Sequence, residues 1–529
     1  MNKNQNHQQF MNDTKSSSRP NSANASSLSE MGKKITNYIR AGYSGLYIVS
    51  AEDQRVEAEI KAIAQSMEFD LFFWNAVDGL VNATTGSQNT ALDPLEALQS
   101  IEEQKEKTIT LLKDFHLHLA DPNPILISKL KQVLAQAKTQ NKTLIILGCR
   151  LTLPPELERE VTVIEFTLPD EQQLSKVLDG IMESAGIKTL AADIREKTIN
   201  AAKGLTTIEA ENAMALSVVE ANGLEPTIIA REKSQAVKKG GLLELVDRRV
   251  SLESIGGLDL LKDWLLKRKN CFSERAKQYG LPTPSGLLIL GIAGTGKSQT
   301  AKATAEVLQV PLLRLDAGKL FAGLVGQSEA NLRAALQTAE AIAPCVLWID
   351  ELEKSFAGAK SSGSTDGGTS ARVLGSFLSW MQEKQSPVFV VATANDVQQL
   401  PPELLRKGRF DEIFFVDLPN QEEREAIWKI VIADYSRDPK DFDLKQLAKI
   451  TEGHTGAEIR AVFFDAMFAA FEEEGEPTDL HIATCLTEFV PLSKLMAEQI
   501  NGLRSWSKGR ARPATSAVIS PVQARMIAA

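Results

Sequence analysis

Cysteine is scarce in this chain of 529 residues. Its four cysteines, Cys149, Cys271, Cys345 and Cys485, lie far apart and form no C-x-x-C pair. This spacing argues against a disulfide framework or a zinc site and favours inert, buried thiols in a reducing compartment. Long apolar runs are lacking too, because no stretch reaches the about eighteen residues that a membrane-spanning helix needs.

Positive charge is also in deficit, since the formal net charge is -9 at pH 7. Proteins that bind nucleic acids in general need a cationic surface, so a nucleic-acid partner is not expected. Residues 1–30 lack an apolar segment and are rich in Asn, Gln and Ser, which predicts a disordered tail rather than a secretory signal. A plastid transit peptide is the alternative interpretation. Residues 505–529 are predicted to be a basic flexible tail.

The pentapeptide LPPEL occurs at 153–157 and again at 400–404, an offset of 400 − 153 = 247. Four further segment pairs follow the same order at nearly the same offset. They begin at Ser44 and Ser285, at 108 and 345, at 143 and 388, and at 204 and 453. This pattern indicates an internal duplication. Strand-like and helical stretches alternate in each copy, which predicts a mainly parallel sheet followed by a helical subdomain.

The second copy contains GIAGTGKS at 291–298, which fits the phosphate-loop pattern G-x-x-x-x-G-K-[ST] between a strand and a helix. Glycines allow backbone N–H groups to surround phosphate oxygens, and the helix N-terminus adds its positive end. Lys297 would reach the outer phosphates of ATP, and Ser298 would bind Mg²⁺. The predicted nucleotide-binding residues of this loop are Gly291, Ala293, Gly294, Thr295, Gly296, Lys297 and Ser298.

Two adjacent acids end the strand in CVLWIDELEK. Asp350 is predicted to hold Mg²⁺ through water, and Glu351 to orient and polarise the attacking water. Asn395, at the tip of the next strand, could position that water from the other side. The plainer alternatives are solvated acids at a strand end and an ordinary turn asparagine.

Arg406 and Arg409 lie in LLRKGRFD. They could pair with local acids, but phosphoryl transfer needs cationic compensation, which a neighbouring subunit can supply. That interpretation predicts a homo-oligomer. Arg159 aligns with Arg406 in the first copy and is better explained as a surface arginine than as a vestigial finger. His116 and His118, expected at a strand end, are interpreted as structural rather than metal-binding.

The first copy is predicted to lack a functional nucleotide site. The positions of the phosphate-loop lysine and serine fall on Val56 and Glu57. In the acidic motif Asp114 matches the first acid, whereas Phe115 replaces the glutamate. We therefore expect the first copy not to bind or hydrolyse ATP.

These motifs resemble those of the AAA branch of the AAA+ ATPases. The resemblance covers residues 255–471 through IGGLD, GIAGTGKS, LVGQSEANLR, WIDELEK, ATAND, LLRKGRFD and GHTGAEI. The tandem layout, with an inactive first copy, resembles the uncharacterised AAA-domain protein family of cyanobacteria and red-algal plastids. The implied fold class is α/β, with tandem AAA+-like modules of a parallel-sheet core plus a helical lid, the first of them degenerate.

The resemblance also implies residue roles and a domain plan. Ile255, Gly256 and Gly257 would border the adenine, and Gly456 and Ala457 would close over the nucleotide from the lid. The expected domains are a degenerate AAA+-like domain at 31–240, a linker at 241–254, an ATPase core at 255–419 and a lid at 420–504.

Some positions depart from the pattern of the mainstream members. Ile292 and Ala293 stand where these members have two prolines, and Lys407 stands where they have another. Leu324 replaces the aromatic residue with which substrate-threading members grip a polypeptide, so peptide threading loses sequence support. The Gly/Ser-rich stretch 357–370 is expected to be a mobile loop.

The function that follows is that of an ATP- and Mg²⁺-dependent ATPase. It would drive or regulate remodelling of an unidentified protein partner, as a ring for which six subunits would fit. The alternatives are a slow-turnover ATP switch or scaffold and a nucleic-acid motor or loader. The family resemblance implies the cyanobacterial cytosol, with the plastid stroma as the alternative.

Overall fold

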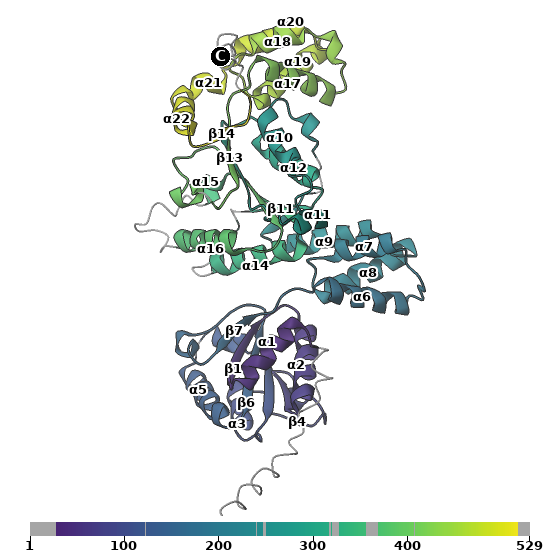
Figure 1. Cartoon of the computed structure of the whole chain (residues 1–529), viewed down its shortest axis with the longest axis vertical. Coiled ribbons are helices and arrows are strands. Elements are labelled where there is room, and N and C mark those ends of the chain that lie inside the picture. The colour runs from purple at the N-terminus through teal and green to yellow at the C-terminus, as the bar shows by residue number, and fades with distance from the viewer. Residues whose placement is uncertain are drawn as a thin grey trace, which may run out of the picture. The chain divides into compact units, whose positions relative to one another are not determined.

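The computed structural model describes residues 28–121, 123–239, 241–246, 250–316, 319, 327–355, 369–406 and 408–516. Leu324, Lys407 and residues 357–368 of the expected mobile loop lie outside the described residues, as do 1–27 and 517–529. The chain divides into two compact units (Figure 1). The first runs to Leu168 and includes Thr206–Ile208, and the second contains Pro169–Leu205 and continues from Glu209.

The first unit is built on a mostly parallel sheet. Its strand order is β4 (Gln88–Asn89), β3 (Gly79–Asn82), β2 (Asp70–Asn75), β5 (Thr108–Lys113), β6 (Lys142–Gly148), β1 (Gly45–Val49) and β7 (Thr162–Glu165). Only the pairings that involve β3 are antiparallel among the strands described. The helical elements are α1 (Glu30–Arg40), α2 (Asp53–Met67), α3 (Pro94–Glu102), α4 (His116–Leu119), α5 (Pro124–Thr139) and the short η2 (Pro155–Leu157).

The second unit contains a sheet of the same kind. Its order is β14 (Arg512–Pro513), β13 (Glu412–Val416), β9 (Gly286–Gly291), β12 (Val388–Ala394), β11 (Cys345–Ile349), β10 (Leu312–Leu315) and β8 (Leu243–Leu245). The central strands are buried along their whole length and mostly apolar, as expected for parallel strands covered on both faces. The helical elements around it are η3 (Leu252–Ser254), α10 (Asp259–Leu266), α11 (Glu274–Tyr279), α12 (Lys297–Leu308), α14 (Gln327–Ile342), α15 (Leu352–Ser355), α16 (Thr369–Glu383) and η5 (Pro402–Leu405).

A helical lid follows the second sheet. Its elements are α17 (Gln421–Asp434), η6 (Pro439–Asp441), α18 (Leu444–Ile450), α19 (Gly456–Glu472), α20 (Asp479–Glu488), α21 (Leu492–Leu495) and α22 (Ala497–Ser507). Trp428, Phe463 and Ile482 are buried in its core. Capping boxes begin α17 at Asn420 and α19 at Thr455, where the N-cap side chain and a glutamate three residues on satisfy each other's backbone donors.

The two sheets share one strand order, as the duplication inferred from the sequence predicts. The order β2-β5-β6-β1-β7 in the first unit corresponds to β10-β11-β12-β9-β13 in the second. The parallel registers agree as well. In the first sheet Gly45 pairs with Leu144 and Thr108 with Lys142; in the second, Gly286 pairs with Val390 and Cys345 with Val388.

This register corrects the expected match of the acidic motif by one residue. With Thr108 placed on Cys345, Lys113 occupies the position of Asp350, and Asp114 that of Glu351. Asp114 and Glu351 also share a left-handed backbone, with φ of 56° and 50°. Phe115, expected to replace the glutamate, is instead a fully buried core residue.

The match of the first copy to the phosphate loop changes too. Only residues 50–52 connect β1 to α2, whereas 292–296 connect β9 to α12. The first helical residue of α2 is therefore Asp53, where α12 has Lys297. Val56, the linear counterpart of Lys297, is buried in the core because the shorter loop turns it inward. Neither Asp53 nor Val56 is a lysine. The first copy is therefore still expected not to bind ATP.

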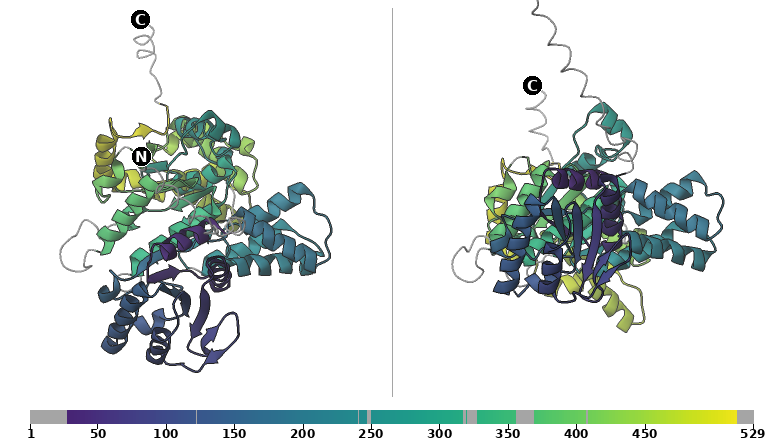
Figure 2. Two further views of the ribbon diagram at one scale, coloured as in Figure 1. Left: turned by 60° about the horizontal axis from the view of Figure 1, so that its bottom comes forward. Right: turned by 90° about the horizontal axis from the view of Figure 1, so that it is seen from below.

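Residues 171–239 form a helical bundle (Figure 2), which belongs to the second unit except for Thr206–Ile208. Its helices are α6 (Glu171–Ser184), α7 (Ala192–Ala202), α8 (Thr207–Ala221) and α9 (Pro226–Lys239). Val237 of α9 is part of the core that covers the second sheet. A Cβ at Gly204 would lie 2.2 Å from Ile342, so the bundle packs closely on the core of this unit. This grouping differs from the expected single domain at 31–240.

Residues 505–516 of the expected flexible tail adopt defined structure. Helix α22 continues to Ser507, and β14 adds to the edge of β13. Ala514 accepts backbone hydrogen bonds from Leu260 at 3.0 Å and Leu261 at 3.1 Å, which ties this segment to the start of α10. Among the described residues, none of the helices combines the length and apolar character needed to cross a membrane.

Candidate functional site

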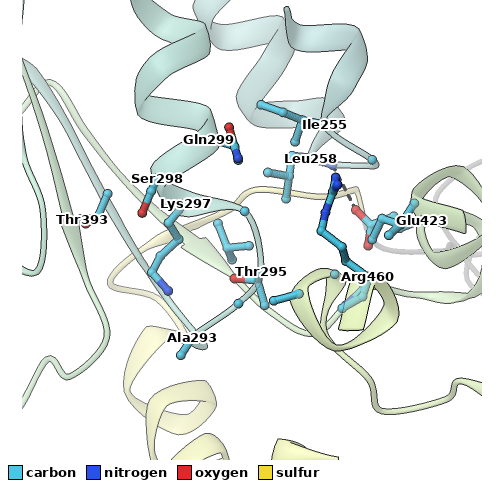
Figure 3. Close-up of a pocket in the computed structure, with 18 of the residues that line it drawn as sticks. Ile255, Leu258, Ala293, Thr295, Lys297, Ser298, Gln299, Thr393, Glu423 and Arg460 are labelled. Carbon is cyan, nitrogen blue, oxygen red and sulfur yellow. Dashed lines mark hydrogen bonds between the residues drawn. The ribbon is translucent and has the colours of Figure 1, made fainter. Parts of the chain in front are cut away.

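A cavity of about 460 Å³ lies between the phosphate loop of the second unit and the lid (Figure 3). Residues 293–298 line it. The loop can fold tightly because Gly294 and Gly296 adopt left-handed backbone angles, with φ of 79° and 91°. Gly291 ends β9 next to this loop and is not among the described lining residues.

Lys297 carries the positive charge of the loop. Its Nζ donates hydrogen bonds to the carbonyls of Gly291 at 3.0 Å and Ile292 at 2.6 Å. Burial lowers the pKa of Lys297 to about 8, and the charges of Glu353, Asp350 and Glu351 oppose that shift. A buried ammonium whose hydrogen-bond partners among the described residues are two carbonyls is suited to an anionic ligand, because a phosphate would restore the solvation that burial removes.

Oxygen groups gather beside the loop. Ser298 Oγ lies 3.2 Å from Asp350 Oδ1, and Thr393 Oγ1 donates to the same carboxylate oxygen at 2.5 Å. Hydroxyl and carboxylate oxygens are the ligands that Mg²⁺ prefers, usually completed by water and substrate phosphate. The described residues contain no group of three or more His, Cys, Asp or Glu that could hold a metal alone. Ser298 and Asp350 therefore fit a metal ion that is also bound by a phosphate ligand.

Glu351 and Asn395 meet at the carboxyl ends of neighbouring strands. Asn395 Nδ2 lies 3.4 Å from Glu351 Oε1, and Lys354 forms an ion pair with the other carboxylate oxygen at 2.8 Å. The backbone N–H of Asn395 donates to Glu353 Oε1 at 3.0 Å. Glu353 is buried, which raises the pKa of its carboxyl. The arrangement holds a carboxylate and an amide beside the phosphate loop.

The opposite wall comes from the segment before α10 and from the lid. Ile255 and Gly256 line the cavity, as do Gly456 and Ala457 of α19. A Cβ at Gly256 would lie 2.5 Å from Ile427, so the glycine permits close packing against the lid. The N–H of Ala457 donates to the carbonyl of Gly294 at 3.0 Å, which joins the lid to the phosphate loop.

Gly257 does not line the cavity, unlike its neighbours. Its φ is 72°, and a Cβ there would lie 2.0 Å from Glu423 Oε1. Glu423 accepts hydrogen bonds from the N–H of Leu258 at 3.0 Å and from Thr515 Oγ1 at 2.7 Å. Gly257 thus makes room for a carboxylate that joins the segment before α10, the lid and the C-terminal segment.

Sequence reasoning missed part of the lining. The missed residues are Ser254, Leu258, Gln299, Thr393, Val416, Asp417, Pro419, Glu423, Ile427, Ile430, Val431 and Arg460. In Figure 3 Ser298 and Thr393 lie on one side of the cavity, and Glu423 and Arg460 on the other. Arg460 bonds to Asp434 at 2.6 Å. Its position directly after GHTGAEI could have identified it, because that motif opens the lid helix.

Arg406 and Arg409 are not among the described residues that line the cavity of their own chain. Arg406 is exposed, and Arg409 donates to the carbonyl of Glu403. The structure therefore brings together the predicted loop, acid, asparagine and lid residues, and leaves both arginines outside.

A parallel sheet with a phosphate loop, paired strand-end acids and a helical lid defines a P-loop nucleotide-binding protein of the AAA type. Family models agree. The model of the "ATPase family associated with various cellular activities (AAA)" matches 287–418, and the AAA+ lid domain matches 441–482. The N-terminal and second domains of SpoVK-like AAA ATPases match 31–166 and 172–240.

Similar proteins span nearly the whole chain. A protein of Trieres chinensis called "Uncharacterized AAA domain-containing protein ycf46" is 43% identical over 491 residues, which cover 91% of this chain and 98% of that protein. Proteins of the same name from Pyropia yezoensis and Guillardia theta are 39% and 40% identical, over 90% of this chain and 98% and 95% of theirs. The chain belongs to this ycf46 family of AAA domain-containing proteins.

Proposed function

We propose that the second unit binds ATP with Mg²⁺ and hydrolyses it. The observation that carries this proposal is the convergence of Lys297, the Ser298–Asp350 pair and Glu351 on one cavity. Membership of the AAA family supports it independently. The proposed nucleotide-binding set is the one predicted from the sequence, without Gly257, whose place is against Glu423.

Each residue has a distinct task in this proposal. Lys297 pairs with the outer phosphates, and the loop N–H groups hold their oxygens. Ser298 and Asp350 would hold Mg²⁺, whose charge offsets that of the phosphates. Glu351 orients the attacking water and polarises it, while Asn395 fixes that water from the other side. Glu353 accepts a hydrogen bond from the backbone N–H of Asn395 and so fixes the position of Asn395 at the strand end.

The remaining roles concern the whole assembly. Arg406 and Arg409 act in a neighbouring subunit of a ring, six subunits being one arrangement that fits. Hydrolysis then drives or regulates remodelling of a protein partner. The first unit, with Asp53 and Lys113 where the second has Lys297 and Asp350, is a degenerate module for regulation, assembly or docking. We place the protein in the cyanobacterial cytosol, with the plastid stroma as the alternative.

A slow-turnover ATP switch is the second candidate. It is favoured by the ion pair between Glu351 and Lys354, which engages the proposed water-orienting carboxylate. The two candidates differ in turnover and not in binding.

The decisive variant is Glu351→Gln. We expect steady-state ATP hydrolysis to fall by about 100-fold or more, because a neutral amide cannot polarise water, while the affinity for a fluorescent ATP analogue stays within a few fold. Glu383→Gln, an exposed glutamate on α16, is the matched control and should change neither. If the wild-type protein hydrolyses ATP no faster than Glu351→Gln, the proposed hydrolysis is contradicted. The slow-turnover switch is then the better explanation.

A further inference from the structure

A buried imidazole in the first unit has no part in the proposed ATPase. His116, expected at a strand end, instead opens the short helix α4 and is 2% exposed. Its Nε2 lies 3.7 Å from Cys149 Sγ, and its Nδ1 has no hydrogen-bond partner among the described residues. Cys149 is exposed. Because buried polar atoms in folded proteins are nearly always paired, this arrangement requires an explanation.

The surrounding backbone leaves room for the imidazole. A Cβ at Gly148 would lie 2.7 Å from His116 Nδ1 and 3.0 Å from the Tyr47 hydroxyl. Tyr47 donates to the carbonyl of Arg150 at 2.7 Å and accepts from the N–H of Thr152 at 3.2 Å. The strand end thus lacks a side chain where the ring lies, and the segment that follows Cys149 is fixed.

A carboxylate completes the group. Asp114 Oδ1 lies 3.9 Å from His116 Nδ1, on the opposite side of the ring from Cys149. Burial lowers the pKa of His116, with Asp114 opposing, so the ring is a neutral base at physiological pH. A thiol within reach of a neutral imidazole is one arrangement that activates a cysteine. Asp114 lies beyond hydrogen-bond distance of the ring and contributes only its charge.

The strand register that the two sheets share gives the counterparts of this group in the second unit. In the shared register, Asp114, His116 and Cys149 occupy the positions of Glu351, Glu353 and Asn395. The positions that surround the attacking water in the second unit therefore hold a carboxylate, an imidazole and a thiol in the first. This correspondence is independent of the distances above.

We propose that Cys149 is a reactive thiol, activated by His116, and that hydroperoxides oxidise it. His116 Nε2 accepts the thiol proton, and the thiolate sulfur attacks one peroxide oxygen. A sulfur–oxygen bond forms as the oxygen–oxygen bond breaks. The sulfur is oxidised to a sulfenic acid, the peroxide is reduced, and the departing alkoxide or hydroxide takes the proton from the imidazolium.

The test treats the full chain with hydrogen peroxide at pH 7, traps sulfenic acid with dimedone and maps the modified peptides. We expect dimedone at Cys149 and not at Cys271 or Cys345, because burial raises the pKa of those two thiols to about 11 and about 12. Iodoacetamide should alkylate Cys149 about tenfold more slowly in His116→Gln than in wild type. Gly148→Ala should also slow this reaction, because it displaces the ring without changing either side chain.

Exposure alone must be separated from activation. Leu151, 45% exposed, offers the control: Leu151→Cys in a Cys149→Ser background presents a thiol two residues away without the imidazole. Wild-type Cys149 should react about tenfold faster than this thiol. Equal rates, or no dimedone at Cys149, would overturn the proposal. Because this comparison needs no His116 variant, it stands even if His116→Gln fails to fold.

Discussion

Lys233 is a lysine buried at the contact between the helical bundle and the sheet of the second unit. Its side chain is 4% exposed, and its Nζ donates to the carbonyl of Lys203 at 3.1 Å. Burial lowers the pKa of Lys233 to about 8 from its usual 10.5. Below pH 8 the native state therefore carries an ammonium that is poorly solvated, and this destabilises the unit.

The contribution of Lys233 to the stability of the protein depends on pH. Between pH 8 and pH 10.5 the unfolded chain retains a proton that the native chain has lost, so the contribution of Lys233 to stability rises with pH. The full change is of the order of 3 kcal/mol. Lys233→Met should stabilise the protein at pH 7 and remove this rise. Urea unfolding at pH 7.5 and 9.5 measures both effects.

The exposed lysine of the same helix provides the control. Lys238→Met should leave the stability at both pH values within about 0.5 kcal/mol of wild type. If the free energies of unfolding of wild type and Lys233→Met differ by the same amount at the two pH values, the Lys233 ammonium is not the source of the instability.

At the scale of elements, the segment before α10 and the start of the lid are joined through Glu423. Gly257→Ala places a Cβ against this carboxylate and strains a backbone with φ of 72°. We expect a loss of about 1–3 kcal/mol in stability. ATP should also bind more weakly, because Ile255 and Gly256 line the cavity. Thermal unfolding and nucleotide titration measure the two effects.

Gly280→Ala separates the clash from the backbone strain. Gly280 has φ of 82°, and a Cβ there would meet nothing within 4 Å. It should share the strain penalty and leave ATP affinity unchanged. If both variants bind ATP equally well, Glu423 does not position the nucleotide-binding segment.

The elements also show which features the sequence could predict. Strands β1, β5 and β6 and their counterparts are mostly apolar runs, so two mainly parallel sheets could be predicted from the repeats, whereas the strand order comes from the structure. The phosphate loop was predictable because its spacing is fixed by the backbone path around a phosphate. Arg460 could have been found from its position directly after GHTGAEI, whereas Glu423 could not, because tertiary packing alone brings it to the cavity.

Two errors in the first unit have different causes. Pairing Asp114 with Asp350, because both are aspartates, placed Phe115 on Glu351, whereas the strand register places Asp114 there. A linear comparison placed Val56 on Lys297, although a shorter loop begins α2 at Asp53. Matching residue types along the sequence does not determine strand register or loop length. These follow from the backbone hydrogen bonds of the folded chain.

At the scale of the whole molecule, the position of the arginines bears on assembly. Arg406 and Arg409 lie outside the cavity that contains Glu351 and Lys297 of the same chain. If a neighbouring subunit supplies them, Glu351→Gln and Arg406→Ala damage different partners of one composite site. Each variant alone should be inactive, because one lacks the water-orienting carboxylate and the other the cation that stabilises the transferred phosphoryl group.

Mixing the two variants then has a defined outcome. An Arg406→Ala subunit that keeps Glu351 can receive the arginine of a Glu351→Gln neighbour, so about a quarter of the interfaces in a randomly mixed ring regain a complete site. Turnover should recover toward that fraction and fall on dilution. A mixture of Glu351→Gln with Lys297→Ala must stay inactive, since both changes damage the same chain's half of the site. Recovery in the first mixture alone would establish that ATP is hydrolysed between subunits, whereas no recovery would place the arginines' role within their own chain.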